Sequence, residues 1–192
     1  VSFFKPKVLV PFASYVYFSN KLNFYLNDSA NQPRDIIKAF EGSNVKVSVM
    51  APFQKLEDLD SETNNINSLA FWDEAFNRKK NIQTYQTIEF KEIQESFENY
   101  KARIFKNNTK RFMKLIRYIS PIAAFKPVII RISDLDMDIN FDLFANSLEQ
   151  SNFNPDISMS SESLNFILKN TFGFDTLTVN GCFEEESRSG FS

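Results

Sequence analysis

Apolar residues recur at intervals of three and four in two stretches near the middle of the chain, which predicts two amphipathic helices. The first stretch, residues 87–107, carries Phe90, Ile93, Phe97, Tyr100 and Ile104, and the second, residues 109–119, carries Phe112, Leu115, Ile116 and Ile119. The Asn-Asn-Thr segment between them favours a break in which Thr109 acts as the N-cap of the second helix.

The N-terminal part has a different pattern, which predicts a strand, a loop, a helix and a second strand. The apolar run at residues 7–10 is a strand that Pro11 ends, because proline has no N–H to donate to a sheet. Residues 32–43 form a helix with Pro33 near its start and Gly42 beyond its end. Residues 45–50 alternate strictly and form a strand. This order is βαβ-like; residues 52–86 look irregular, apart from a short helix around 69–76.

After residue 121 the apolar period changes to two, which is typical of strands. We expect strands at residues 126–134, 137–144, 155–161 and 175–184, and a helix at 161–172 that Ser160 or Ser161 caps. In the second strand Ile139, Phe141 and Leu143 point inward. The predicted fold is therefore α+β in three parts: an α/β domain over 1–86, an amphipathic helical connector over 87–120, and an antiparallel sheet with a helix over 121–192.

The formal net charge of −2 over 192 residues gives no general attraction to nucleic acid or to acidic membranes. One local exception is a basic run interleaved with aromatic residues, a combination that contacts phosphates or anionic lipids in other proteins. We favour the alternative that the run is a solvated helix face, whose charge the glutamates upstream balance. Nucleic acid is therefore not an expected partner, and contact of residues 101–117 with a membrane surface is possible but not favoured. The run consists of Lys101, Arg103, Lys106, Lys110, Arg111, Lys114 and Arg117.

Metal chemistry has few candidate ligands, because the chain has no histidine and a single cysteine. Asp134, Asp136 and Asp138 are spaced like calcium ligands, but an EF-hand needs glycine and glutamate where Ile139 and Ala145 stand. A polar turn between two strands is the better interpretation, since aspartate bonds its own backbone in turns. We expect no metal or cofactor in this chain.

No nucleophile has an evident base. Ser14 lacks the G-x-S-x-G elbow, and Cys182 has no histidine to pair with. A catalytic lysine or a carboxylate pair stays open, although nothing singles one out. The lone cysteine and the absence of a signal peptide or an apolar run long enough to span a membrane favour a reducing, cytoplasmic location.

The segment KPKVLVPFASYVYFSNKLNFYLNDSANQPRDI, with the strand VKVSVMAP after it, resembles the closing part of a metallo-β-lactamase-fold domain. The similar type is that of CMP-N-acetylneuraminate hydroxylase and its bacterial relatives. That family takes its metal from an H-x-H-x-D-H motif, which this sequence lacks, and Asn20 stands near where a histidine is expected. The resemblance implies a degenerate copy or the C-terminal part of a longer hydrolase, with zinc or iron bound in the parent protein. The absence of an initiator methionine favours the fragment.

The last third resembles a sterol-carrier-protein module through PDISMSSESLNFIL and DTLTVNGCFE. Such modules bind apolar ligands in isolation and also occur appended to metallo-β-lactamase-fold enzymes such as alkyl sulfatases. The pairing implies that this part shapes or covers a substrate site.

Two functional hypotheses follow. The first is a non-catalytic C-terminal part of a hydrolase with an accessory domain, which would partner an upstream catalytic domain or a second copy of the chain. Its candidate pocket-wall residues are Ser14, Tyr15, Asn27 and Asn31, and the alternative for each is a loop held by amide hydrogen bonds. The second hypothesis is a module that binds a lipid or another apolar ligand in a cavity beside Phe141, Phe166 and Phe172.

Overall fold

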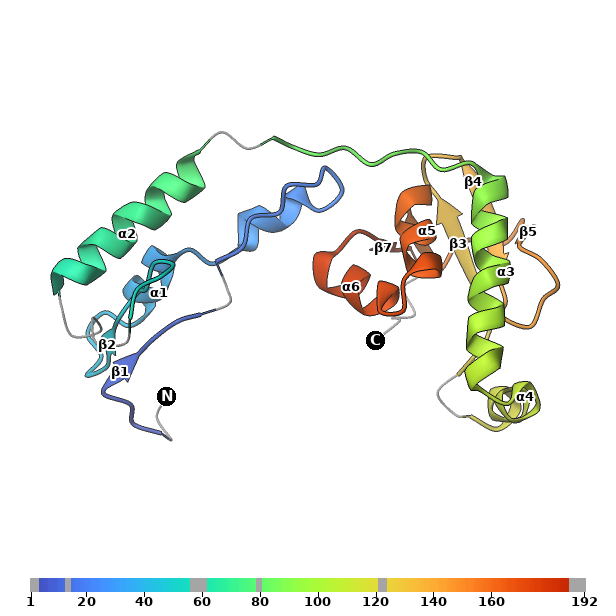
Figure 1. Cartoon of the computed structure of the whole chain (residues 1–192), viewed down its shortest axis with the longest axis horizontal. Helices are drawn as coiled ribbons and strands as arrows, with labels where there is room; N and C mark the ends of the chain where they lie inside the picture. Colours follow the sequence, from blue (N-terminus) through green and yellow to red (C-terminus); the bar gives the residue numbers. More distant parts are fainter. Residues whose placement is uncertain (1–3, 13–14, 56–61, 79–80, 121–123, 187–192) are drawn as a thin grey trace. The chain divides into compact units, whose positions relative to one another are not determined.

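The computed structural model describes residues 4–12, 15–55, 62–78, 81–120 and 124–186. Two compact units divide the chain (Figure 1). The first unit comprises residues 1–19 and 24–83, and the second comprises residues 20–23 and 84–192. The α+β class predicted from the sequence is confirmed.

The first unit has a strand, a helical segment and a second strand in the predicted order. Strand β1 (Val8–Leu9) pairs in parallel with β2 (Lys46–Val47), and between them lie the 3₁₀ helix η1 (Phe24–Ser29) and helix α1 (Pro33–Ala39). Pro33 occupies the first turn of α1, where its missing N–H costs nothing. The backbone N–H of Gln32 donates to Asp35 Oδ2 at 2.8 Å, which closes a capping box at this start.

The segment predicted to be mostly irregular contains a long helix, α2 (Glu62–Asn77). The side-chain amide of Asn65 on α2 forms hydrogen bonds with the backbone at the end of β2. Its oxygen accepts from the Val49 N–H at 2.7 Å, and its nitrogen donates to the Val47 carbonyl at 3.1 Å. Trp72 Nε1 donates to the Met50 carbonyl at 2.9 Å. The prediction was too short because these polar residues, poor helix formers in isolation, obtain their partners from a distant segment.

The second unit contains a five-stranded sheet in the order β5-β4-β3-β6-β7. The strands are β3 (Val128–Ile132), β4 (Met137–Phe141), β5 (Glu149–Gln150), β6 (Ile157–Met159) and β7 (Glu184–Glu185). The predicted antiparallel sheet is wrong in one respect, because β3 and β6 pair in parallel while the other pairs are antiparallel. After the edge strand β5 the chain crosses the sheet, and β6 pairs with the edge of β3 that faces away from β4. The alternation of residues within a strand does not show which strand it pairs with or in which direction.

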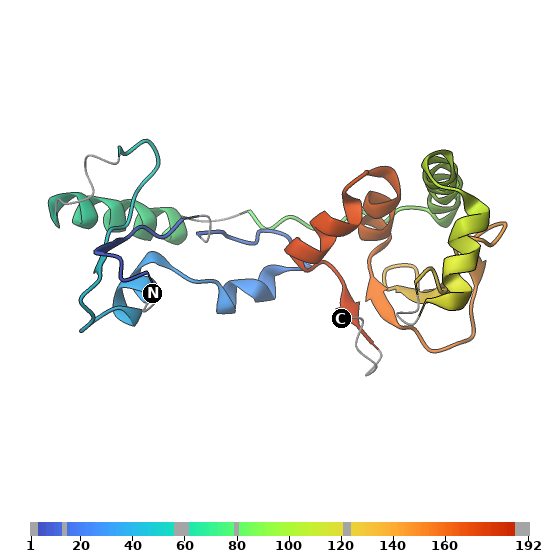
Figure 2. The same cartoon turned by 90° about the horizontal axis from the view of Figure 1, so that it is seen from below.

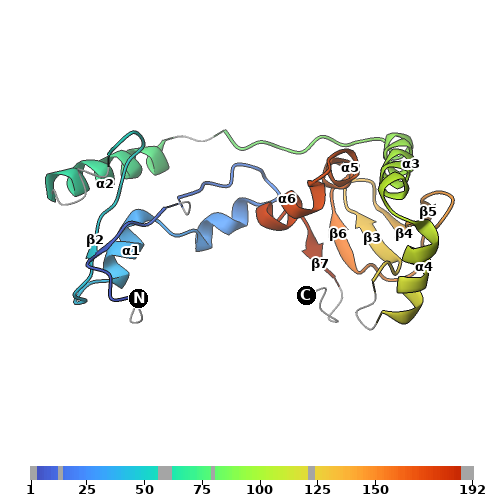
Figure 3. The ribbon, with the colours of Figure 1, turned by 60° about the horizontal axis from the view of Figure 1, so that its bottom comes forward.

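Helix α3 (Phe90–Asn107) packs beside α5 (Ser161–Lys169) against this sheet, as Figure 3 shows. Ile93 and Phe97 of α3 are fully buried and join one hydrophobic cluster with the sheet and α5. The helix that the sequence analysis assigned to a connector thus supplies core residues of the second unit. Ser160 caps α5, since its hydroxyl oxygen accepts from the Ser163 N–H at 3.2 Å.

The strand expected at 175–184 is largely a helix, α6 (Gly173–Asn180), followed by the short β7. Gly173 allows α6 to approach α5 closely, because a Cβ at this position would stand 2.6 Å from Ile167 Cα. Leu177 is buried while Val179 is exposed, and Gly181 ends the helix with a left-handed φ of 64°. The alternation that predicted a strand was wrong because packing against α5 selected the helical spacing.

Helix α4 (Lys110–Ile119) follows α3 after the predicted break. Figure 1 shows α4 nearly end-on at the foot of α3, and Figure 2 shows it from the side, so the two helices cross steeply. Thr109 has the extended backbone of an N-cap but accepts no side-chain cap bond. Of the helices in the described parts of the chain, none combines the length and the apolar composition that crossing a membrane requires.

Candidate functional site

The polar residues proposed for a pocket wall in the first unit do not converge on one place. Ser14 lies outside the described residues. The Tyr15 ring packs on Trp72 with centroids 5.0 Å apart, and its buried hydroxyl has no hydrogen-bond partner within the described structure. Burial raises the pKa of Tyr15. Asn31 is exposed.

Asn27 holds the loop of the first unit together. Its Oδ1 accepts from the Phe18 N–H at 2.9 Å, and its Nδ2 donates to the carbonyls of Phe18 at 2.8 Å and Phe24 at 2.9 Å. All of these partners are backbone groups, which matches the alternative of a loop held by amide hydrogen bonds.

Asn27 also lines a hollow of about 160 Å³, which Tyr15 and Asn31 do not line. The carboxylate in this hollow is Asp73, and it is engaged by Arg34, whose Nε lies 2.9 Å from Asp73 Oδ1. The hydrogen bond from Arg34 lowers the pKa of Asp73, so this carboxylate is a poor proton acceptor near neutral pH. The remaining lining residues are Val16, Tyr17, Ala30, Gln32, Phe76 and Asn77.

The second unit contains an apolar cavity of about 290 Å³ between α3, α4 and the β3–β4 hairpin. Most of its walls are aliphatic or aromatic, and polar groups come from Asn108, Lys126 and the Tyr100 hydroxyl. The lining residues are Tyr100, Ile104, Asn108, Met113, Phe125, Lys126, Val128, Phe141 and Leu143.

Helical spacing and aromatic contacts position these walls. Tyr100 and Ile104 lie one turn apart on α3, and Met113 of α4 is 6 % exposed. The Phe141 ring contacts Phe97 edge-to-face at a centroid distance of 5.3 Å and Tyr100 at 6.4 Å. Burial raises the pKa of Tyr100, so its hydroxyl stays protonated and can donate a hydrogen bond at neutral pH.

Of the three phenylalanines proposed for an apolar cavity, the structure brings only Phe141 to this one. Phe166 on α5 and Phe172 at the start of α6 are 40 % and 72 % exposed and do not line it. Tyr100, Ile104 and Met113 were not predicted as cavity residues. The helical spacing of Tyr100 and Ile104 was visible, but the same spacing serves a filled interface equally well, and Met113 lies off the apolar face predicted for the second helix.

A wider groove of about 590 Å³ has Lys126 in common with the cavity. Its cations stand beside an aromatic ring: Lys114 Nζ lies 5.8 Å and Arg117 Cζ 5.5 Å from the Phe144 centroid. Arg117 Nη1 is also bonded to Asp142 Oδ1 at 2.9 Å, so its charge is largely neutralised. Tyr118 and Pro127 complete the lining.

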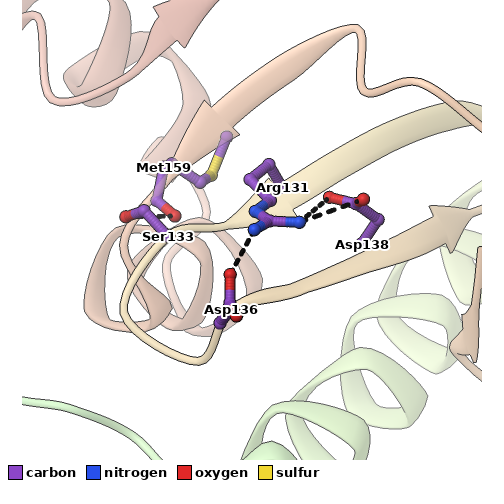
Figure 4. Close-up of polar contacts among 5 residues, drawn as sticks. All are labelled: Arg131, Ser133, Asp136, Asp138 and Met159. Carbon is purple, nitrogen blue, oxygen red and sulfur yellow. Dashed lines mark hydrogen bonds and ion pairs between the residues drawn. The ribbon is translucent and has the colours of Figure 1, made fainter.

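The three aspartates at the β3–β4 turn have structural partners. Asp134 accepts from the N–H and the hydroxyl of Ser161 at 2.7 and 2.6 Å, which ties the turn to α5. Figure 4 shows Arg131 donating to Asp136 and to both oxygens of Asp138, the latter at 3.2 Å. The predicted polar turn is confirmed. The described ranges contain no group of three or more residues of metal-ligating type in a suitable arrangement.

Two further residues from the sequence analysis have local roles. Asn20 accepts from the Leu22 N–H at 2.9 Å and so forms a turn. Cys182 is half-buried, and burial together with the Glu162 carboxylate raises the pKa of its thiol. A raised pKa disfavours the thiolate, which is the nucleophilic form.

Comparison with known proteins finds no match for this chain among protein-family models, curated proteins or solved structures.

Proposed function

We propose that the second unit is a binding module for a small apolar molecule, held in the cavity between α3, α4 and the β3–β4 hairpin. The observation that carries the proposal is the cavity of about 290 Å³ with predominantly apolar walls. Ligand sites are typically concave and apolar, with a few polar groups that orient the ligand. Here Asn108, Lys126 and the protonated hydroxyl of Tyr100 can serve that purpose.

The volume sets the scale of ligand and affinity. Since one water molecule takes about 30 Å³ in the liquid, the cavity of about 290 Å³ corresponds to roughly ten water molecules or ten non-hydrogen ligand atoms. At about 0.5 kcal/mol per atom, such a ligand gains about 5 kcal/mol, which is a Kd of about 0.1–1 mM. Tighter binding requires a ligand that also extends into the neighbouring groove.

A neutral fluorescent probe tests this proposal. 1-Aminonaphthalene, whose size matches the cavity, should show enhanced, saturable fluorescence with the full chain, because it gains an apolar environment. Leu143→Trp places a larger side chain in the cavity wall and should weaken probe binding at least about fivefold, while the matched Val179→Trp, on an exposed position of α6, should not. Equal binding by both variants, with unchanged circular dichroism, would refute the cavity as the site.

We propose as a second candidate that the chain is the non-catalytic C-terminal part of a metallo-β-lactamase-fold hydrolase with a sterol-carrier-like accessory domain. The parallel pairing of β1 and β2, with η1 and α1 between them, supports this reading of the N-terminal part. The test is the reading frame upstream of Val1: an H-x-H-x-D-H motif and stoichiometric zinc or iron in the longer protein would support it. A start codon directly before Val1 would contradict it.

A further inference from the structure

Helix α4 exposes an apolar stripe. Phe112, Leu115 and Ile119 are spaced by three and four residues, so they lie on one side of the helix, and they are 60 %, 53 % and 69 % exposed. Met113, on another side, is buried and faces the cavity. The helix therefore has apolar residues on its outer side as well as on its inner side.

Some cations of the basic run form hydrogen bonds or ion pairs within the fold, and the others do not, although Lys110 and Lys114 lie beside the rings of Phe105 and Phe144. Lys101 Nζ donates to the carbonyls of Ala145 and Asn146 at 2.9 and 2.6 Å. Arg103 donates to the last carbonyls of α5, including that of Leu168 at 3.1 Å. With Arg117 bound to Asp142, three of the seven cations are committed to the fold of the second unit.

The other four cations, Lys106, Lys110, Arg111 and Lys114, are exposed. No carboxylate within the described residues forms an ion pair with any of them. The sequence has no aspartate or glutamate between residues 99 and 133, so an ion pair needs a carboxylate from another part of the chain, as Arg117 obtains from Asp142. Three of the four lie on α4 itself, and Lys106 lies on the last turn of α3. At about 100° per residue, Arg111 borders the apolar stripe at Leu115 and Lys114 follows further round the helix, whereas Lys110 lies opposite the stripe, with its Nζ 4.9 Å from the centroid of the Phe105 ring.

We propose that the outer side of α4 docks on an anionic lipid bilayer. The docking surface consists of Arg111, Phe112, Lys114, Leu115 and Ile119. A bilayer interface supplies both kinds of partner at once, because acyl chains take up the apolar stripe and anionic headgroups pair with the cations. The proposal goes beyond ligand binding in the cavity and does not depend on it.

The dimensions and the flanking residues fit a helix lying in the plane of the interface. Ten residues of α4 span about 15 Å, too short to cross a bilayer but long enough to lie in it. Tyr118 at the end of the helix is 88 % exposed, and tyrosine is favoured at headgroup level because one end is apolar and the other polar. Nucleic acid would satisfy the cations but not the aliphatic side chains of Leu115 and Ile119.

Vesicle co-sedimentation of the full chain tests the proposal. Vesicles of phosphatidylcholine with phosphatidylserine should bind the chain, vesicles of phosphatidylcholine alone should bind it much more weakly, and added salt should reduce binding to the former. R111Q/K114Q should lower the partition coefficient about 25-fold, at about fivefold per charge removed. L115Q/I119Q should lower it at least about tenfold.

Matched controls carry the same chemical changes on other exposed positions. Lys91→Gln removes an exposed cation from α3, and Phe153→Gln removes an apolar side chain that is 77 % exposed. Both should bind anionic vesicles like the original chain. Circular dichroism of every variant separates loss of docking from loss of folding.

Three results would overturn the proposal. The first is absence of binding to anionic vesicles, and the second is binding that neither salt nor R111Q/K114Q reduces. The third is a dimer in sedimentation velocity that L115Q/I119Q dissociates, because the stripe would then belong to an interface between copies of the chain.

Discussion

Replacing Lys101 by methionine should destabilise the second unit by about 2–3 kcal/mol. The side chain of Lys101 is only 11 % exposed, and its ammonium group is held by two carbonyls of the turn after β4. Methionine keeps most of the buried stem but offers no donor. The turn 142–147 then loses its hydrogen bonds to α3, although the contact of the Phe144 ring with Phe105 of α3 and the adjacent core residue Leu148 remain.

The magnitude follows from the individual contacts. A hydrogen bond from a charged donor contributes about 1.5–3 kcal/mol. The carbonyl of half-buried Ala145 bears most of this loss, whereas that of exposed Asn146 can be rehydrated. The ion pair with Glu98, whose side chain is 53 % exposed, adds at most about 1 kcal/mol. The ring of Phe97, 4.8 Å from Nζ, adds about 0.5–1 kcal/mol, and relief of the desolvated ammonium offsets part of the total.

Urea unfolding followed by far-UV circular dichroism measures the effect. Tryptophan fluorescence is unsuitable, because Trp72, the single tryptophan, belongs to the first unit. Lys106→Met is the matched control: Lys106 is exposed on the same helix, so its replacement should change stability by less than about 0.5 kcal/mol. Faster amide exchange at 144–148 should accompany the loss in Lys101→Met alone. Equal stabilities of the two variants would refute the assignment of Lys101 to the turn.

Three further predictions concern α6, the thiol and a cavity residue. Gly173→Ala should cost about 1–3 kcal/mol in urea unfolding, because its Cβ would collide with Ile167 Cα at 2.6 Å; an unchanged midpoint would contradict this close approach. Cys182 should react with iodoacetamide more slowly in the folded than in the urea-unfolded chain near pH 8, because burial and Glu162 raise its pKa, and Glu162→Gln should partly restore the rate. The raised pKa of Tyr100 favours its protonated form in the folded state, so its contribution to stability is complete below the unfolded value of about 10 and is lost as pH rises through the folded value. Stability should therefore fall above about pH 10, and Tyr100→Phe should reduce that fall; an identical pH profile would contradict the burial of the hydroxyl.

The period of the apolar residues correctly predicted those helices and strands in which the apolar residues recur at one regular interval. The extents of α3 and α4, the β3–β4 hairpin and the inward position of Ile139 agree with the structure. The buried side of α4 does not, because Phe112, Leu115 and Ile119 are exposed and Met113 is buried: a helical period shows which residues share a side but not which side packs. Periodicity was wrong at α6, where the same residues fit a strand and a helix, and only contact with α5 selects one. It also underestimated α2, whose Asn65 is stabilised by backbone groups 16 and 18 residues away.

The candidate sites depended still more on tertiary structure. Asn27 stood out as a possible wall residue and is instead held by backbone groups of its own loop. The apolar cavity draws on two helices and two strands, and a cavity is a failure of side chains to fill space, which no local pattern encodes.

The sequence by itself determined the α+β class, the two amphipathic helices and an acid-free span rich in lysine and arginine. Only the tertiary structure decided which of those cations are bonded within the fold and which remain exposed to bind a partner. Lys101 and Lys106 are both lysines on the same helix. Lys101 is buried and bonded to a carbonyl of a turn 44 residues further along the chain, whereas Lys106 is exposed. The physical reason is that a charge is neutralised by groups near it in space, and the fold alone determines which groups those are.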